Sequence, residues 1–292
     1  MTHFSDKTVH VIAGPTASGK TAAAIRLARS LGAEIISADS RQCYRELRIG
    51  VARPSPEELA AVPHHFIASH SVTENLTAAD FEAYALMKAE ALFGRANDVV
   101  MVGGTGLYIQ AFCEGLDAIP EIPAAIRDSI RSEYEAGGMD WLQAAVQAED
   151  PGFYAVGEIR NPHRLLRALE VKRATGASIL TFRSGKKKQR PFAIRKYALQ
   201  IPKEELHDRI HLRVDRMMEE GLLDEVRSLM PYRYLPALQT VGYRELFAFL
   251  DGDLSLGQTV TDIKTNTRRY AKRQLTWFRK DPGFTWVSPD HF

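Results

Sequence analysis

The chain has 292 residues, 45% of them hydrophobic and 25% charged, with a formal net charge of +2, which is typical of a globular protein and gives no global sign of a nucleic-acid partner. Its two cysteines, Cys43 and Cys113, lie far apart and without metal-ligand spacing, which argues against a disulfide framework or a zinc site. No apolar run is long enough to span a bilayer and the N-terminus shows no secretion signal, so we expect a cytoplasmic protein.

A phosphate-binding loop follows the first predicted strand. The apolar run 9–12 indicates a buried strand, and 21–31 has the apolar spacing of a helix packed on a sheet. Between them, the chain matches the pattern G-x-x-x-x-G-K-[ST] in full. Such a loop points backbone N–H groups at one anion, while Lys20 adds a charge and the Thr21 hydroxyl is placed to hold Mg²⁺. The sequence therefore predicts a diphosphate or triphosphate site formed by Gly14, Pro15, Thr16, Ala17, Ser18, Gly19, Lys20 and Thr21.

The next elements alternate between strands and helices. Residues 33–38 read as a strand that ends at Asp39, 76–93 as a helix, and 98–102 as an apolar strand that ends at Gly103. This alternation, with strands that are apolar throughout, predicts a parallel sheet covered on both faces. Since ligands bind at the carboxyl ends of such strands, we expect Gly14, Asp39 and Gly103 to converge on one crevice.

Asp39 opens the run Asp-Ser-Arg-Gln-Cys-Tyr at the end of the second strand. A carboxylate beside a phosphate loop could coordinate Mg²⁺ through water, act as a general base or orient an acceptor. It could equally cap a short helix, for which aspartate is a common choice. The sequence alone leaves both interpretations open.

The strand at 98–102 ends without an acidic residue. Many nucleotide hydrolases and kinases place a carboxylate at this position to hold Mg²⁺. Here the chain has Gly103, Gly104, Thr105 and Gly106, so the backbone is free to approach closely and Thr105 offers a hydroxyl at the start of a helix. This absence argues against an ordinary kinase or ATPase.

A helical insertion follows a proline-rich linker at 119–123. Beyond that linker we expect helices at 124–136, 141–148, 154–158 and 162–175, before strand character returns at 197–201. We therefore expect a P-loop NTPase-like parallel sheet, formed by 1–118 and 196–292 and flanked by helices, with an all-helical subdomain inserted at 119–195. The remaining expected elements are helices at 206–220, 222–230, 242–250 and 256–280 and a strand at 284–287.

Basic residues gather in two segments. Residues 183–196 are typical of a solvated loop, whereas 264–280 reads as a basic helix that also carries Tyr270, Trp277 and Phe278. Arginine and lysine beside aromatic side chains suit an RNA backbone with unstacked bases. The same aromatic residues could instead pack on the core, and both interpretations remain open.

Taken together and in order, these segments resemble the bacterial tRNA dimethylallyltransferases, which are isopentenyl transferases acting on adenosine 37 beside the anticodon. The phosphate loop alone is common, but the ordered set of motifs is specific to this family. The matching segments lie at 14–21, 39–44, 63–65, 102–109, 161–170, 213–226, 241–245 and 267–279.

The resemblance implies transfer of a dimethylallyl group from dimethylallyl diphosphate to N6 of adenosine 37, with release of pyrophosphate. It implies that the substrates are tRNAs reading codons that begin with U. Lys20, Thr21 and Mg²⁺ would then stabilise the leaving diphosphate, and Arg213 resembles an arginine that reaches it. Asp39 resembles the residue that receives the proton of the amine, and Thr105 the residue that helps position the base and the diphosphate.

The resemblance also assigns contacts with the anticodon stem-loop of tRNA. The matching positions are Asp39, Ser40, Arg41, Gln42, Thr105, Arg127, His163, Arg164, Leu165, Leu166 and Arg167. A monomer is the default expectation. A phosphate-loop small-molecule kinase, an adenylate isopentenyltransferase that uses a free nucleotide, and a non-catalytic RNA-binding protein are the competing interpretations.

Overall fold

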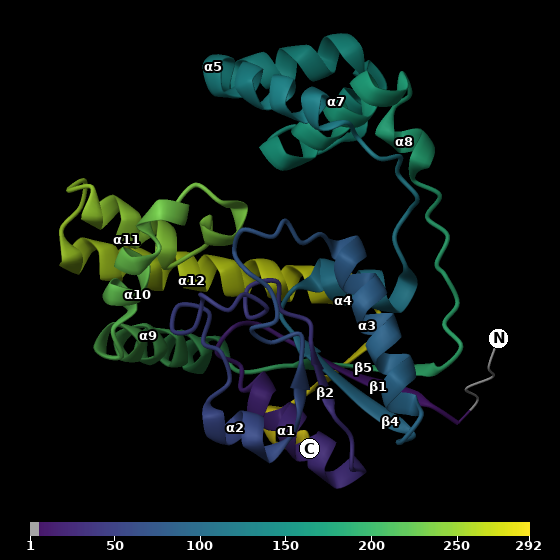
Figure 1. The fold of residues 1–292 in the computed structure, drawn as a ribbon, viewed down its shortest axis with the longest axis vertical. Helices are drawn as coiled ribbons and strands as arrows, with labels where there is room; N and C mark the ends of the chain where they lie inside the picture. Colours follow the sequence, from purple (N-terminus) through teal and green to yellow (C-terminus); the bar gives the residue numbers. More distant parts are fainter. Residues whose placement is uncertain (1–5) are drawn as a thin grey trace. The chain divides into compact units, whose positions relative to one another are not determined.

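The computed structural model describes residues 6–292, and its sheet has six strands in the order β3-β2-β4-β1-β5-β6. Figure 1 labels four of them, β2, β4, β1 and β5. Every pair of neighbouring strands is parallel, so the predicted α/β fold with a parallel sheet is confirmed. The expectation about a secretion signal involves residues 1–5, which lie outside the described residues. The strands are β1 (Thr8–Ala13), β2 (Ile35–Ser37), β3 (His64–His65), β4 (Asp98–Gly103), β5 (Ala193–Leu199) and β6 (Phe284–Val287).

Successive residues of the buried strands face opposite sides of the sheet. Val9 and Val11 of β1 belong to one apolar cluster, with residues of α3 and α4, whereas Ile12 belongs to another, with residues of α1. Helices therefore cover both faces, and this explains why the strands are apolar throughout. These helices are α1 (Lys20–Leu31), α3 (Ala78–Phe93) and α4 (Gly106–Glu114), while α2 (Pro56–Ala61) precedes β3.

The chain forms two compact units, one from residues up to 115 together with 189–292 and the other from 116–188. The second unit is helical and consists of α5 (Ala124–Glu149), α6 (Pro151–Val156), α7 (Pro162–Thr175) and α8 (Ile179–Phe182). Inside α5, Gly138 has the non-helical angles φ 65° and ψ −158°, so two helices meet there, as the sequence predicts. Arg173 fastens this unit internally by ion pairs of 2.8 Å to both Glu133 and Glu149.

The strand that returns from the helical unit begins earlier than we expected. β5 starts at Ala193 and not at residue 197, so 193–195 belong to the sheet and not to the insertion. Arg195 and Lys196 give this stretch a polar appearance, but it pairs with β1 from Thr8 onward. Lys196 is accommodated there by ion pairs to Glu114 and Asp281.

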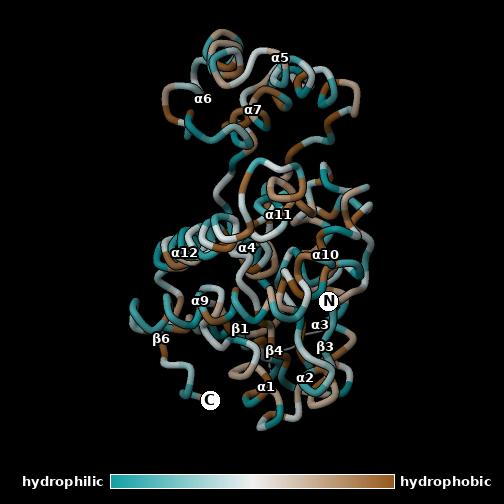
Figure 2. The backbone as a smooth tube through the Cα atoms, turned by 90° about the vertical axis from the view of Figure 1, so that its left-hand side faces the viewer, coloured by the Kyte–Doolittle hydropathy of each residue, from teal (hydrophilic) through white to brown (hydrophobic). Residues whose placement is uncertain are grey.

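The C-terminal part of the first unit is mainly helical. It contains α9 (Lys203–Glu219), α10 (Leu222–Ser228), α11 (Tyr243–Leu250) and α12 (Leu256–Arg279), with 3-10 turns at Met230–Tyr232, Pro236–Leu238 and Pro289–His291. α12 packs against α4, α9 and α11 (Figure 1), and Figure 2 shows it mostly in hydrophilic colours. Within residues 6–292, none of the helices has the length and apolarity needed to cross a bilayer.

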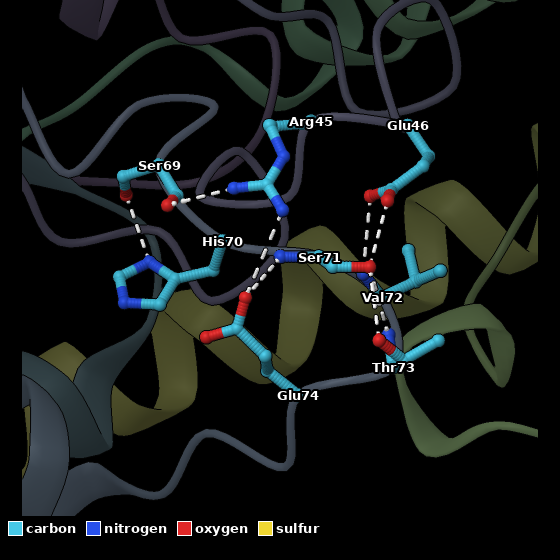
Figure 3. A network of polar contacts seen from close by, with 8 residues as sticks. All are labelled: Arg45, Glu46, Ser69, His70, Ser71, Val72, Thr73 and Glu74. Atoms are coloured by element: carbon cyan, nitrogen blue, oxygen red, sulfur yellow. Dashed lines mark hydrogen bonds and ion pairs between the residues drawn. The ribbon is translucent and has the colours of Figure 1, made fainter.

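Two loops beyond the strand ends are fastened to each other (Figure 3). Backbone hydrogen bonds join 42–45 to 68–70. The Glu46 carboxylate accepts the Ser71 hydroxyl at 2.8 Å and the Val72 amide at 3.0 Å. The loop after β2 is therefore held in place before any ligand arrives.

Candidate active site

A cavity of about 840 Å³ opens at the carboxyl ends of the parallel strands. Asp39 after β2 and Gly103 at the end of β4 line it, as expected from their places at strand ends. Of the predicted phosphate loop, Thr16–Thr21 line the cavity, whereas Gly14 and Pro15 do not. Residues of α9 and α12 form further parts of its wall. The cavity lies entirely within the first unit.

The phosphate loop has the backbone shape that its glycines allow. Gly14 and Gly19 have φ angles of 153° and 82°, both in the region that side chains disfavour. Helix α1 begins at Lys20, so its first amides, which have no acceptor within the helix, open towards the loop. The Lys20 ammonium donates to the Pro15 carbonyl at 2.6 Å and so folds over the loop. This arrangement has the geometry of a phosphate-binding loop, and the binding of a diphosphate there stays a prediction.

The buried basic groups of the cavity favour the binding of an anion. Burial and the nearby Arg213 guanidinium lower the pKa of Lys20 from 10.5 to about 7, while the Asp39 carboxylate opposes that shift. Burial likewise lowers the pKa of Arg213, against the effects of Asp39 and Glu58. Two basic groups thus lie in a desolvated site, and an arriving diphosphate would compensate both.

The cavity wall also contains arginines that sequence reasoning missed. Arg209 and Arg216 join Arg213 on one face of α9, at spacings i, i+4 and i+7, and this helical spacing is the signal that could have identified them. Arg209 forms an ion pair of 2.6 Å with Glu205, and its Nη1 lies 3.7 Å from the position a Cβ would take on Gly19. The complete basic lining is Lys20, Arg41, Arg48, Arg53, Arg209, Arg213 and Arg216, against the carboxylates Asp39, Glu58 and Glu220.

Asp39 caps the turn that follows β2. Its Oδ1 accepts the amides of Arg41 at 2.9 Å and Gln42 at 3.3 Å. Asp39 therefore caps a turn and not the short helix that we considered, and the same carboxylate also lines the cavity. Since both hydrogen bonds engage Oδ1, the cap fixes the carboxylate without using Oδ2 in these two contacts.

Thr105 joins the ends of β2 and β4. Its hydroxyl accepts the Ser40 amide at 3.0 Å and donates to the Ser40 hydroxyl at 3.3 Å. A Cβ on Gly103 would lie 2.1 Å from the Ala38 carbonyl oxygen. The glycine there permits the close approach of the chain at the ends of β2 and β4.

A single carboxylate holds the segment 48–50 at the cavity wall. Glu225 of α10 accepts the amides of Arg48, Ile49 and Gly50 at 3.1, 2.7 and 3.0 Å and the Tyr243 hydroxyl at 2.6 Å. The fit is close, because a Cβ on Gly50 would stand 2.7 Å from the Tyr243 ring. This segment is consequently rigid.

The side-chain amide of Gln42 supports the wall next to that segment. It donates to the carbonyls of Val51 and Ala52 at 3.2 and 2.9 Å. Gln42 is thus engaged by the wall, while its predicted contact with tRNA stays a prediction.

Beside the basic groups the cavity has an apolar side, formed by Ile49, Val51, Leu212, Met217, Leu222, Val241 and Ile263. The cavity lining therefore combines cations with hydrocarbon side chains.

The remaining candidates for RNA contact lie on α5 and α7 of the helical unit. His163 and Arg164 are exposed, Arg127, Leu166 and Arg167 are half-buried, and Leu165 is fully buried in the core of that unit. The side chain of Leu165 therefore packs in the apolar core, whereas the others reach the surface. Their contacts with tRNA stay predictions.

The basic helix combines the two roles that the sequence left open. On α12, Phe278 is 1% exposed and packs in the core, whereas Tyr270 and Trp277 are 37% and 38% exposed. Arg269, Lys272 and Arg273 are exposed as well. Tyr270 also lines the cavity, where burial and the Asp39 carboxylate raise its pKa to about 12. α12 therefore presents aromatic rings and cations both at the cavity and on its exposed side, which suits a single-stranded nucleic acid.

The residues of the cavity fit a magnesium ion that is held by few protein ligands and mainly by phosphate oxygens of the substrate. The Thr21 hydroxyl lines the cavity beside Lys20 and is an oxygen donor of the kind Mg²⁺ prefers. Within residues 6–292, no three His, Cys, Asp or Glu side chains come together as a ready-made metal site. Mg²⁺ commonly uses few protein ligands together with phosphate oxygens and water, and the residues present agree with that mode.

Comparison with known proteins identifies relatives over nearly the whole chain. The family model described as IPP transferase matches residues 42–281. The tRNA dimethylallyltransferase of Christiangramia forsetii is 47% identical over 96% of this chain and 92% of its own length, and tRNA dimethylallyltransferase 1 of Bacteroides thetaiotaomicron is 44% identical over 97% and 92%.

Solved structures agree. The tRNA isopentenylpyrophosphate transferase of Bacillus halodurans has a TM-score of 0.70 at 35% identity, over 97% of this chain and 90% of that one. A eukaryotic dimethylallyltransferase acting on tRNA has a TM-score of 0.80 at 25% identity, over 98% of this chain and 74% of that one. These structures share the P-loop NTPase-like fold found here.

Proposed function

Because the chain belongs to the IPP transferase family, we propose that it is a tRNA dimethylallyltransferase that transfers a dimethylallyl group from its diphosphate to N6 of adenosine 37. The product would be N6-dimethylallyladenosine in tRNAs that read codons beginning with U, and pyrophosphate would leave. The observation that carries the proposal is one cavity in which a phosphate loop, a carboxylate and an apolar wall lie together. We place the reaction in the cytoplasm and propose that the enzyme acts as a monomer.

In this proposal the phosphate loop holds the leaving group. As the bond between the allylic carbon and the diphosphate oxygen breaks, negative charge grows on that oxygen and is stabilised by the loop amides, Lys20 and Arg213. Donors that already point at this position need no reorganisation during the reaction. The apolar side chains opposite would hold the dimethylallyl group, and they keep water away from an electrophilic carbon.

Asp39 serves as the proton acceptor in the same proposal. The N6 amine forms the new bond to carbon, and the proton that it loses passes to the Asp39 carboxylate. An aromatic amine is a weak nucleophile because its lone pair is delocalised into the ring, so a base placed at the site is useful. The cap on Oδ1 orients the carboxylate for this task.

Mg²⁺ completes the proposed site. When bound, it would neutralise charge on the diphosphate, and Thr21 is the protein ligand that we assign to it. The exposed face of α12 and the surface residues Arg127, His163, Arg164 and Arg167 are the proposed contacts with the anticodon stem-loop. Their cations would neutralise phosphates, so RNA binding should weaken with salt.

The test is a transfer assay with labelled dimethylallyl diphosphate and an anticodon stem-loop containing adenines at positions 36 to 38. We expect label in the RNA in the presence of Mg²⁺ and without ATP. A matched stem-loop with guanine at position 37 should take up no label. Transfer of label to free AMP as the sole acceptor would instead indicate an adenylate isopentenyltransferase. ATP-dependent phosphorylation of a small molecule, with no label in the RNA, would refute the proposal.

A further inference from the structure

One buried side chain joins two of the loops that form the cavity. Gln274 of α12 is 7% exposed. Its Oε1 accepts the amide of Thr16 at 2.8 Å, and its Nε2 donates to the carbonyl of Gly104 at 2.9 Å. Because one partner is a backbone donor and the other a backbone acceptor, the orientation of the side-chain amide is determined. Gln274 therefore connects the phosphate loop to the loop after β4.

The same line of hydrogen bonds continues to the carboxylate. Next to Gly104, the amide of Thr105 donates to the Ala38 carbonyl at 3.3 Å, and the Thr105 hydroxyl accepts the Ser40 amide at 3.0 Å. Asp39 lies between these two anchored residues. A continuous series of contacts thus runs from the phosphate loop, through Gln274 and the loop after β4, to Asp39.

The contact between Gly104 and the side-chain amide of Gln274 is tight. A Cβ on Gly104 would lie 2.3 Å from Gln274 Nε2, so the backbone and the side-chain amide meet at a distance that only glycine permits. Buried hydrogen bonds of this kind are costly to leave unmade, because water cannot replace the lost partner. The two loops are consequently held at one separation.

We propose that Gln274 is a positioning residue that sets the distance between the diphosphate in the phosphate loop and the carboxylate of Asp39. This inference rests on the proposed function, in which the diphosphate leaves the allylic carbon while Asp39 accepts the proton of the attacking amine. Gln274 lines the cavity, but both of its polar atoms are engaged by backbone, so we assign its effect to the positions of Thr16 and Gly104. A misplacement of about 1 Å between reacting groups can cost about 100-fold in rate.

The location of Gln274 extends the inference to the RNA. α12 carries the exposed rings of Tyr270 and Trp277 within a turn of it. The helix that presents an RNA-binding face is therefore fastened to the loop that holds the leaving group.

The test compares Gln274→Met, which keeps the length of the side chain but makes no such hydrogen bonds, with Gln258→Met as a matched control. Gln258 lies on the same helix and is exposed, and its side-chain amide donates to the nearby Asp262. We expect Gln274→Met to lower kcat by about 100-fold, while KM for dimethylallyl diphosphate and Kd for pyrophosphate stay within about threefold of wild type. Gln258→Met should change none of these values.

Three results decide the matter. A folded Gln274→Met enzyme with wild-type kcat overturns the proposal, and so does a loss of kcat matched by an equal loss of pyrophosphate affinity, because the loop would then have collapsed. If Gln274→Met fails to fold, Gln274→Glu replaces it, since it keeps an acceptor for Thr16 but presents a second oxygen to Gly104, and the same split is expected. Wild-type protein that transfers no label refutes the proposed function itself, which separates that failure from this one.

Discussion

The charge of Lys20 makes diphosphate binding depend on pH. With the site free, burial and Arg213 lower the pKa of Lys20 to about 7, so the ammonium loses its proton as the pH rises above neutrality. A bound diphosphate places negative charge beside the ammonium and raises this pKa. Binding above pH 7 must therefore take up a proton, whereas below pH 7 the lysine is charged in both states.

The size of the effect follows from this shift. Each unit of pKa difference corresponds to about 1.4 kcal/mol, or tenfold in affinity. Half of the free sites already lack this proton at pH 7, so between pH 7 and pH 9 the affinity for pyrophosphate should fall by up to about 50-fold through Lys20 alone. Below pH 7 Lys20 should contribute no pH dependence.

Calorimetric titration with pyrophosphate at fixed Mg²⁺ measures this dependence. Pyrophosphate has its own ionisations, so Lys20→Arg serves as the reference, because arginine keeps its charge over this range. The difference between the two pH profiles isolates Lys20. Parallel profiles for the two proteins from pH 6 to pH 9 would show that Lys20 keeps its proton in the free site and would refute the reasoning.

Three further tests probe other parts of the cavity. Asp39→Asn keeps an acceptor for the cap and should lower transfer by at least about 100-fold with pyrophosphate affinity retained; lost affinity in titration would instead indicate a role in binding. Arg209→Ala should lower the affinity for pyrophosphate by about tenfold. Glu205→Gln releases Arg209 from its ion pair and should raise that affinity. If both variants bind pyrophosphate as wild type does, Arg209 is excluded from the site. Glu225→Ala should lower the free energy of unfolding by about 3 kcal/mol in urea titrations, because buried donors lose their acceptor, whereas the neighbouring Asp224→Ala should be neutral; similar values for both would contradict that role.

The elements that sequence reasoning predicted well are those with a local signal. The apolar strand at 98–102, the proline-started helix Pro162–Thr175 and the phosphate loop each follow from a short stretch of chain, and the structure has all three. The ordered motifs also led to the correct family. β3 was missed because a strand of two residues, His64 and His65, has no periodicity to detect.

The side chains that sequence reasoning missed depend on distant partners. Gln274 stands in a basic helix and reads as part of a solvated face, yet its partners Thr16 and Gly104 are backbone atoms of two remote loops. Glu225 likewise resembles a surface carboxylate until the amides of 48–50 are brought to it by the fold. A pattern within one segment contains no information on such pairs.

The strand order has a consequence for synthesis of the protein. β1 emerges first from the ribosome, but its neighbour β5 is translated only after the whole helical unit, and Leu199 of β5 packs against Gly14 of the phosphate loop. The helical unit is contiguous in sequence and can fold while the chain is still growing, whereas the central sheet must wait. Since Gln274 arrives later still, the phosphate-binding loop acquires its final support only near the end of translation. A nascent chain would thus hold a folded helical unit before it has a working site for the diphosphate.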